Sequence, residues 1–218
     1  MVTLDANEDM QRLVDSGVVA VMRGADADTI IEVAQALNEG GVTAYEITAD
    51  NPDAMELISE VSASFTDEEA IVGAGTVLDS ETARASIMNG AEFVVGPNFD
   101  EGVVETCNRY GTLVAPGILT PTEAVDAYEA GADMVKVFPA SVMGPKHLAS
   151  IKGPLPQIPL MPTGGIDIDN VADYVEAGAV VVGAGSAIMD GDAIAAGDFE
   201  SITETAREFT RVIEDARE

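Results

Sequence analysis

Basic side chains are scarce in this sequence. Its 218 residues include 10 lysines and arginines against 39 aspartates and glutamates, which gives a formal net charge of −29 at pH 7. Nucleic acids and anionic membranes are bound through basic patches, so this composition argues against both kinds of partner. The acidic residues are dispersed along every segment rather than collected in one tail. Dispersed acids with scarce lysine are typical of halophilic proteins, because at about 1 M salt charges are screened over only some 3 Å. We therefore expect stability that increases with salt.

Cysteine and histidine occur once each, as Cys107 and His147. A single cysteine excludes an internal disulfide framework and fits a reducing cytosol, so we predict a cytoplasmic protein. A Cys/His metal site cannot be assembled from one residue of each, and we expect neither a metal nor another cofactor; cysteine–histidine catalysis stays formally open. Long apolar runs are missing too. None approaches the roughly 20 residues of a membrane span, and the polar, acidic stretch 1–11 does not resemble a leader peptide.

Apolar residues nevertheless make up 47% of the chain, enough for a full core. Short apolar runs alternate eight times with stretches of helical periodicity, and such runs are typical of strands buried on both faces of a parallel sheet. The predicted strands are Val18–Met22, Ala44–Thr48, Ile71–Gly75, Phe93–Val95, Leu113–Pro116, Met134–Phe138, Pro159–Met161 and Val180–Val182. Helices are predicted before them at about 7–16 and after them at about 200–216. This order predicts an α/β protein, a (β/α)8 TIM barrel with an N-terminal helix, forming one domain over residues 1–218. A doubly wound open sheet is the alternative, but no G-x-G-x-x-G motif follows the first strand.

Polar residues and glycines stand where these predicted strands end. They are Arg23 after the first, Glu46 and Thr48 on the second, Thr76 after the third, Pro97 after the fourth, Gly117 after the fifth, Lys136 and Phe138 on the sixth, Thr163-Gly164-Gly165 after the seventh and Gly183-Ala184-Gly185-Ser186 after the eighth. In a barrel of this kind the chemistry lies at the carboxyl-terminal ends of the strands. The convergence of these groups on one mouth predicts a functional site there.

Lys136 is one of only three lysines and lies inside the apolar run Met134–Pro139. On a strand it must either extend to water at an edge or be held in a pocket. Desolvation in a pocket favours the neutral amine, which attacks a carbonyl carbon to form a Schiff base. Glu46 also interrupts an apolar strand, and a buried carboxylate is rarely without a partner. Facing Lys136 across the barrel, Glu46 could shuttle protons during such chemistry; a structural ion pair with Lys136 or Arg23 is the other reading.

The two glycine-rich loops after the seventh and eighth predicted strands contain no lysine or arginine. Adjacent backbone N–H groups can hold a phosphate, and a phosphate site after these strands is frequent in this fold. Plain βα turns would account for the glycines as well. Elsewhere, Thr120-Pro121-Thr122-Glu123 predicts a helix start, with Thr120 as N-cap and Glu123 as its capping-box partner, rather than a reactive site.

Several of these segments resemble the bacterial-type 2-keto-3-deoxy-6-phosphogluconate (KDPG) aldolase family. That family also includes 2-keto-3-deoxy-6-phosphogalactonate (KDPGal) and 4-hydroxy-2-oxoglutarate aldolases. The resemblance spans roughly residues 15–190, and its motifs are Gly41–Thr48, Val72–Val77, Ala115–Gly117 with Pro121–Glu123, Gly131–Ala140 and Met161–Gly165. The occurrence of these motifs in this order is specific to the family.

The resemblance implies a metal-independent class I aldolase, commonly a homotrimer, that cleaves a 2-keto-3-deoxy-6-phospho-sugar acid to pyruvate and glyceraldehyde 3-phosphate. Lys136 would form the Schiff base with the keto carbon, and Glu46 would act as general acid and base. The implied substrate contacts are Arg23 and Thr48 near the active site, Thr76 at the pyruvate carboxylate, Phe138 beside the Schiff base, and Gly164, Gly165, Gly185 and Ser186 at the phosphate.

The chain departs from the family pattern at one place. Where typical KDPG aldolases read Glu-x-Thr-x-Arg, this sequence reads Glu46-Ile47-Thr48-Ala49-Asp50. The missing arginine is expected to grip the substrate carboxylate, which Asp50 would repel. Either Arg23 and Thr76 carry that anchoring or the preferred substrate differs. Because KDPGal-type aldolases also lack this arginine, the C4 epimer stays open.

Three other functions remain as alternatives. The first is a 4-hydroxy-2-oxoglutarate aldolase, although the retained glycine loops favour a phosphorylated substrate. A phosphate-binding barrel isomerase would use Glu46 as a base without covalent chemistry, and its activity would survive loss of Lys136. A non-catalytic sugar-phosphate binding protein would be stabilised by its ligand and form no product. Fold alone does not separate these readings, because one barrel hosts many chemistries.

Overall fold

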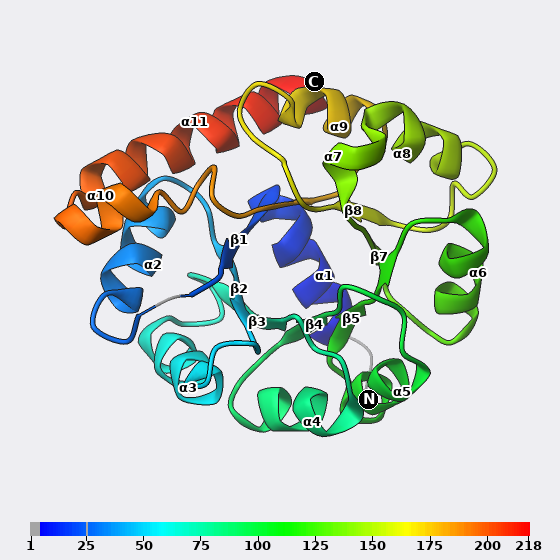
Figure 1. Cartoon of the computed structure of the whole chain (residues 1–218), viewed down its shortest axis with the longest axis horizontal. Coiled ribbons are helices and arrows are strands. Elements are labelled where there is room, and N and C mark those ends of the chain that lie inside the picture. Colours follow the sequence, from blue (N-terminus) through cyan, green and yellow to red (C-terminus); the bar gives the residue numbers. More distant parts are fainter. Residues whose placement is uncertain (1–4, 25) are drawn as a thin grey trace.

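The computed structural model describes residues 5–24 and 26–218, in which parallel strands form a curled sheet surrounded by helices (Figure 1). The strands are β1 (Val18–Met22), β2 (Ala44–Thr48), β3 (Ile71–Gly75), β4 (Phe93–Val95), β5 (Leu113–Ala115), β6 (Gly117–Ile118), β7 (Val135–Val137), β8 (Leu160–Pro162) and β9 (Val182–Ala184). The helices are α1 (Asp5–Ser16), α2 (Ile30–Glu39), α3 (Ala54–Ser64), α4 (Ser80–Met88), α5 (Glu101–Tyr110), α6 (Pro121–Glu129), α7 (Ala140–Met143), α8 (Pro145–Lys152), α9 (Val171–Glu176), α10 (Gly191–Ala196) and α11 (Phe199–Arg217). The predicted α/β barrel architecture with a helix at its N-terminus is confirmed.

The sheet closes into a barrel at two places where the pairing between neighbouring strands is less extensive. Strands pair in the order β5-β4-β3-β2-β1-β9, and β6-β7-β8 form a shorter second set. The elements β5 and β6 are two halves of one strand interrupted at Pro116, which has no N–H but accepts a hydrogen bond from the Lys136 backbone N–H at 2.9 Å. On the other side, parallel bridges pair Leu160 with Ala179 and Thr163 with Gly183. With β5 and β6 counted as one strand, the barrel has eight strands, and β2 and β7 lie on opposite sides of it.

The limits of the first four strands agree with the sequence prediction, the predicted strand Pro159–Met161 lies one residue later as β8 (Leu160–Pro162), and the last strand is shifted further. The prediction of Val180–Val182 was wrong by two residues, because pairing with β1 and not the apolar run sets the register. Val18 pairs with Val182, and the ladder continues to Ala184. The Val180 carbonyl accepts a hydrogen bond from Arg217 Nη2 at 2.9 Å instead. Gly183 and Ala184 therefore belong to the strand rather than to the loop that follows it.

Apolar side chains fill two separate layers. One lies between the sheet and the outer helices and includes Tyr45 and Ile47 on β2. The other fills the inside of the barrel and consists of Leu13, Val19, Ala44, Ile71, Phe93, Val95, Leu113, Ala115, Met134, Met161 and Val181. Successive residues of a strand point to opposite faces, so Glu46 and Thr48 follow Ala44 on the inner face of β2. The inner layer makes the barrel a packed core rather than a pore.

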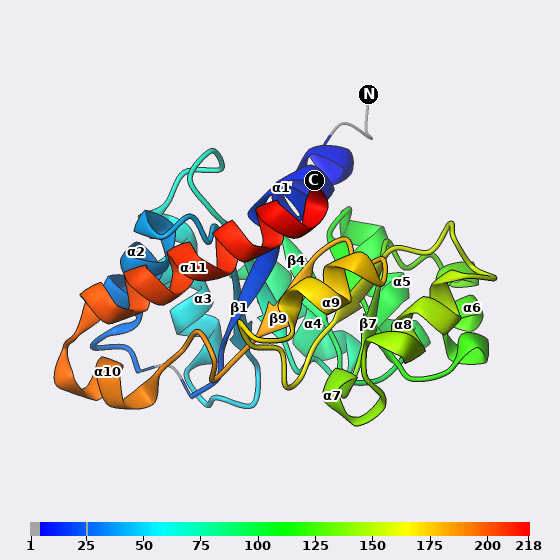
Figure 2. The ribbon, with the colours of Figure 1, turned by 90° about the horizontal axis from the view of Figure 1, so that it is seen from above.

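Helix α1 closes the amino-terminal end of the barrel. Leu13 belongs to the inner layer, and Met10 packs against it. The Arg12 guanidinium donates to Asp9 and Glu92 and to the Ala70 carbonyl. Figure 2 shows α1 on one side of the barrel and α7 and α10 toward the other. Because α1 covers the amino-terminal end, a ligand cavity is expected at the carboxyl-terminal end of the barrel.

The predicted capping box at the start of α6 is confirmed. Thr120 Oγ1 accepts a hydrogen bond from the Glu123 backbone N–H at 3.3 Å, and Glu123 Oε2 accepts one from the Thr120 N–H at 2.8 Å. The hydrogen bond that the Leu119 N–H donates to the same carboxylate lowers the pKa of Glu123, as does the bond from Thr120.

In the part of the chain that the structure describes, no helix combines the length and apolar character needed to cross a bilayer.

Candidate active site

A cavity of about 670 Å³ opens at the carboxyl-terminal ends of the strands. It is lined by Val21, Arg23, Glu46, Thr76, Pro97, Lys136, Phe138, Thr163, Gly164, Gly165, Ile166, Gly185, Ser186 and Met189. The predicted site residues therefore all reach this cavity except Thr48, which is buried and is not part of its lining. Residues scattered over the sequence from Arg23 to Ser186 meet here because parallel strands present their carboxyl ends on one side of the barrel.

Lys136 and Glu46 face each other across the cavity. Lys136 lies on β7 and Glu46 on β2, and the Lys136 Nζ is 3.7 Å from Glu46 Oε1. Both side chains are almost fully buried, with 7% and 1% exposed. Lys136 is therefore not an edge-strand lysine that extends to water. Placing two charged groups in such surroundings costs several kcal/mol per ion before their attraction is counted.

The Glu46 carboxylate has unused hydrogen-bonding capacity. At 3.7 Å the contact with Lys136 is longer than a hydrogen bond. Neither carboxylate oxygen accepts a hydrogen bond from the described residues, although both are buried. Most buried polar groups in proteins are satisfied, so such exceptions mark places where a ligand or a reacting group is expected. The ion pair that the sequence left open is thus with Lys136 and not with Arg23.

Glu46 has room for its side chain because Gly75 on the neighbouring strand β3 has none. A Cβ at Gly75 would lie 2.5 Å from Glu46 Cγ and closer still to the carboxylate. The two residues are near neighbours across the ladder, where Glu46 pairs with Gly73 and Thr48 with Gly75. A glycine here is needed for the close approach, not for an unusual backbone conformation.

Arg23 lies at the rim of the cavity and is held by two neighbouring loops. Its Nη2 donates to Thr76 Oγ1 at 3.0 Å, and its Nη1 forms an ion pair with Asp50. Thr76 has φ of 56°, the one positive value among the described non-glycine residues. Such a conformation costs on the order of 1–3 kcal/mol and is found most often at functional sites. Asp50, which stands at the arginine position of the Glu-x-Thr-x-Arg pattern, thus contacts Arg23.

The two glycine loops line the cavity on its other side. Gly164 and Gly165 have φ values of 95° and 77°, which glycine adopts without strain. Within the described chain, the backbone N–H groups of Gly164, Gly165, Gly185 and Ser186 make no hydrogen bond to another backbone group. Free N–H groups on neighbouring loops are suited to bind an anion.

Two threonines differ from the expectation. Thr48 Oγ1 and Thr163 Oγ1 are both buried without a hydrogen-bond partner among the described residues. Thr163 lines the cavity and has space because Gly183 on β9 lacks a side chain: a Cβ there would lie 2.9 Å from Thr163 Cγ2. The sequence placed Thr163 at a strand end without assigning it to the site. The apolar lining residues Val21, Ile166 and Met189 carry no sequence signal that separates them from core residues.

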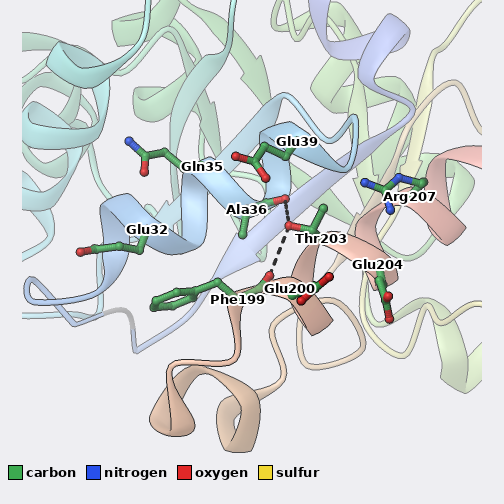
Figure 3. Close-up of a pocket in the computed structure, with 9 residues that line it drawn as sticks. All are labelled: Glu32, Gln35, Ala36, Glu39, Phe199, Glu200, Thr203, Glu204 and Arg207. Carbon is green, nitrogen blue, oxygen red and sulfur yellow. Dashed lines mark hydrogen bonds between the residues drawn. The ribbon is translucent and has the colours of Figure 1, made fainter.

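A second hollow, of about 450 Å³, lies on the outside of the barrel between α2 and α11 (Figure 3). Its lining carries Glu32, Glu39, Glu200, Glu204 and Arg207. The Thr203 hydroxyl inside it donates to the carbonyl of Ala36 at 2.9 Å, which ties α11 to α2, and lies 3.2 Å from the carbonyl of Phe199 on its own helix.

Across residues 5–24 and 26–218, no cluster of three or more histidine, cysteine, aspartate or glutamate side chains is arranged to hold a metal ion.

A buried lysine opposite a buried carboxylate, at the carboxyl end of a (β/α)8 barrel, is an arrangement suited to an enzyme that forms a Schiff base. Comparison with known proteins agrees. A family model described as KDPG and KHG aldolase matches residues 10–205. The 2-dehydro-3-deoxy-phosphogluconate aldolase of Treponema pallidum is 35% identical over 207 residues, which cover 94% of this chain and 96% of that protein. The 2-dehydro-3-deoxy-6-phosphogalactonate aldolase of Escherichia coli is 33% identical over 202 residues, with coverage of 92% and 95%.

A solved structure extends the agreement to three dimensions. KDPG aldolase from Legionella pneumophila, with pyruvate captured as a covalent carbinolamine intermediate, superposes with a TM-score of 0.85 at 26% identity, covering 95% of this chain and 98% of that one. The chain belongs to the KDPG and KHG aldolase family. It is accordingly an aldolase, a carbon–carbon lyase.

Proposed function

We propose that this aldolase cleaves 2-keto-3-deoxy-6-phosphogluconate, its galactonate epimer or both to pyruvate and D-glyceraldehyde 3-phosphate. The observation that carries the proposal is the buried pair of Lys136 and Glu46, 3.7 Å apart in a cavity that also contains free backbone N–H groups. Relatives named for each epimer match at nearly the same identity, 35% and 33%, so similarity alone does not choose between them.

Lys136 supplies the nucleophile in this mechanism. Its neutral amine attacks the C2 keto carbon and forms a carbinolamine, which loses water to give an iminium ion. The iminium withdraws the electron pair of the C3–C4 bond as that bond breaks, while the C4 hydroxyl loses its proton and becomes the aldehyde. The remaining enamine is protonated at C3, and hydrolysis releases pyruvate and the amine. The iminium supplies the electrophilic stabilisation for which other enzymes use a metal.

Glu46 is the proton carrier in these steps. Its carboxylate accepts no hydrogen bond from the described residues and lies close to Lys136 Nζ, where it can take a proton during carbinolamine formation and deliver one to the enamine. Phe138 supports the geometry, because its ring centroid is 5.3 Å from the same Nζ. A ring face at this distance stabilises the positive charge of the iminium ion.

The remaining lining residues orient the substrate. Thr76 and Arg23 bind the carboxylate beside the reacting carbon, whereas Thr48 lies outside the cavity lining and its buried hydroxyl has no hydrogen-bond partner among the described residues. The backbone N–H groups of Gly164, Gly165, Gly185 and Ser186 bind the 6-phosphate. In a protein with so few basic side chains, backbone donors are the main resource for holding this dianion.

Four further features belong to the same proposal. The chain acts as a single barrel domain, needs no cofactor and works as a homotrimer. It functions in a cytoplasm of high salt concentration, where dispersed acidic side chains are well screened. Its one cysteine, Cys107, is buried and fits a reducing compartment.

The test is the rate of pyruvate release from each of the two epimers, followed with lactate dehydrogenase in high salt. We expect Lys136→Met to lower kcat by about 10³-fold or more and Glu46→Gln by about 10²–10⁴-fold. Lys146→Met, which removes an exposed lysine from α8, is the matched control and should keep full activity. Circular dichroism confirms that each variant is folded. Pyruvate release that survives in Lys136→Met would exclude the covalent mechanism.

A further inference from the structure

We propose that Asp50 is a positioning residue that holds Arg23 in place for the substrate carboxylate. Typical KDPG aldolases carry an arginine at this position, whereas KDPGal-type members of the family lack it, so relative to the former the charge at the rim of the cavity is reversed here. The inference rests on the proposed function, since it concerns the binding of the carboxylate next to the reacting carbon. It assigns a role to a residue that does not itself line the cavity.

The geometry follows from three neighbouring strands. Met22 pairs with Ile47 and Thr48 with Gly75, so the residues just beyond β1, β2 and β3 are adjacent at the mouth. From these loops Asp50 and Thr76 each bind one terminal nitrogen of Arg23. A guanidinium has five N–H donors, and these two contacts leave three of them for a ligand.

Arg23 depends on these contacts for its orientation. Its side chain is 59% exposed, and Asp50 and Thr76 are its only hydrogen-bond or ion-pair partners among the described residues. A Cβ at the adjacent Gly24 would meet no atom within 4 Å, so the space beside that glycine is open. Without Asp50, the long side chain would be held by one neutral hydrogen bond.

Arg23 is also the cation that the substrate carboxylate needs. Of the two positively charged side chains that line the cavity, Lys136 faces Glu46, which leaves Arg23 for the anion. A guanidinium and a carboxylate bind through short, charge-assisted hydrogen bonds. Asp50 repels the same anion from outside the cavity lining, where about 1 M salt screens charges over some 3 Å. In high salt, positioning therefore outweighs repulsion.

The experiment measures pyruvate binding apart from turnover. Protein is incubated in molar KCl with a series of pyruvate concentrations and reduced with borohydride, and intact mass gives the trapped fraction. We expect Asp50→Ala to raise the half-saturating pyruvate concentration about three- to ten-fold, which is the cost of ordering one long side chain. The trapped fraction at saturation and kcat should change little. Asp50→Asn, which keeps a hydrogen-bond acceptor, should show a smaller rise.

Two controls make the result specific. Asp53→Asn removes the same charge three residues away, from an exposed side chain without a capping hydrogen bond, and should leave the half-saturating concentration unchanged. In an Arg23→Gln background, Asp50→Ala should have no further effect. An unchanged or lower half-saturating concentration in Asp50→Ala, or full additivity with Arg23→Gln, would overturn the positioning role. If the wild-type protein gives no adduct at any concentration, the proposed function itself fails, and this inference fails with it.

Discussion

The fit between Gly75 and Glu46 gives a quantitative prediction. A Cβ at Gly75 would lie 2.5 Å from Glu46 Cγ, whereas carbon atoms in ordinary contact are about 3.5–4.0 Å apart. In Gly75→Ala the Glu46 side chain must therefore move by about 1 Å or more, away from its position 3.7 Å from Lys136 Nζ. A displacement of about 1 Å in a catalytic group lowers the rate by about 10²-fold. Forcing a methyl group into a packed core costs about 1–3 kcal/mol, so the variant should still fold.

The assay compares kcat for pyruvate release with thermal stability. Gly153→Ala is the control, because that glycine, the C-cap of α8, has helical backbone angles and a Cβ there would lie at an ordinary 3.5 Å from the Ala149 carbonyl. It should keep full activity. Gly75→Ala should add nothing to the loss already caused by Glu46→Ala, since both changes act on the same carboxylate. Wild-type activity in Gly75→Ala, or a further loss in the double variant, would refute the assigned role of Glu46.

Three other predictions concern stability and reactivity. The melting temperature should rise from about 0.1 M to about 2 M KCl, because screening relieves the repulsion within a chain of net charge −29; a flat profile would contradict the halophilic reading. Thr120→Ala should lower the free energy of unfolding by about 1 kcal/mol in a denaturant titration, whereas its exposed neighbour Thr122→Ala should change little; equal effects would exclude the capping box. Burial, with the nearby charge of Asp133, raises the pKa of Cys107 to about 12, so it stays a thiol at pH 8.5. Its alkylation by iodoacetamide should be about 10³-fold slower in the native protein than in denaturant; equal rates would show an accessible thiolate.

Much of the fold could be predicted because burial leaves a direct trace in the sequence. Strands covered on both faces are continuously apolar, and β1 to β4 were predicted residue for residue on that ground. The error at β9 has a physical cause: Gly183 and Ala184 are too small to mark a strand, and β1 decides where the ladder runs. The break between β5 and β6 at Pro116 is likewise a matter of hydrogen bonding and not of hydrophobicity.

The site was predictable where a residue conflicts with its surroundings. Lys136 and Glu46 stood out as charges within apolar strands, and the structure places them together. The ion pair between Arg23 and Asp50 could not be foreseen, since both residues lie in polar loops where a charge is unremarkable. Distances across the barrel depend on strand register, which a single sequence does not state. For the same reason, the clearance that Gly75 gives to Glu46 becomes visible only in three dimensions.

The central claim is that Lys136 forms a Schiff base, and one measurement tests it directly. The protein is incubated with pyruvate and sodium borohydride in high salt, and the masses of the intact protein and of its peptides are determined. We predict one reduced pyruvate adduct per chain, on the peptide that contains Lys136. No adduct in a folded protein, or an adduct on Lys146 or Lys152 instead, would contradict it.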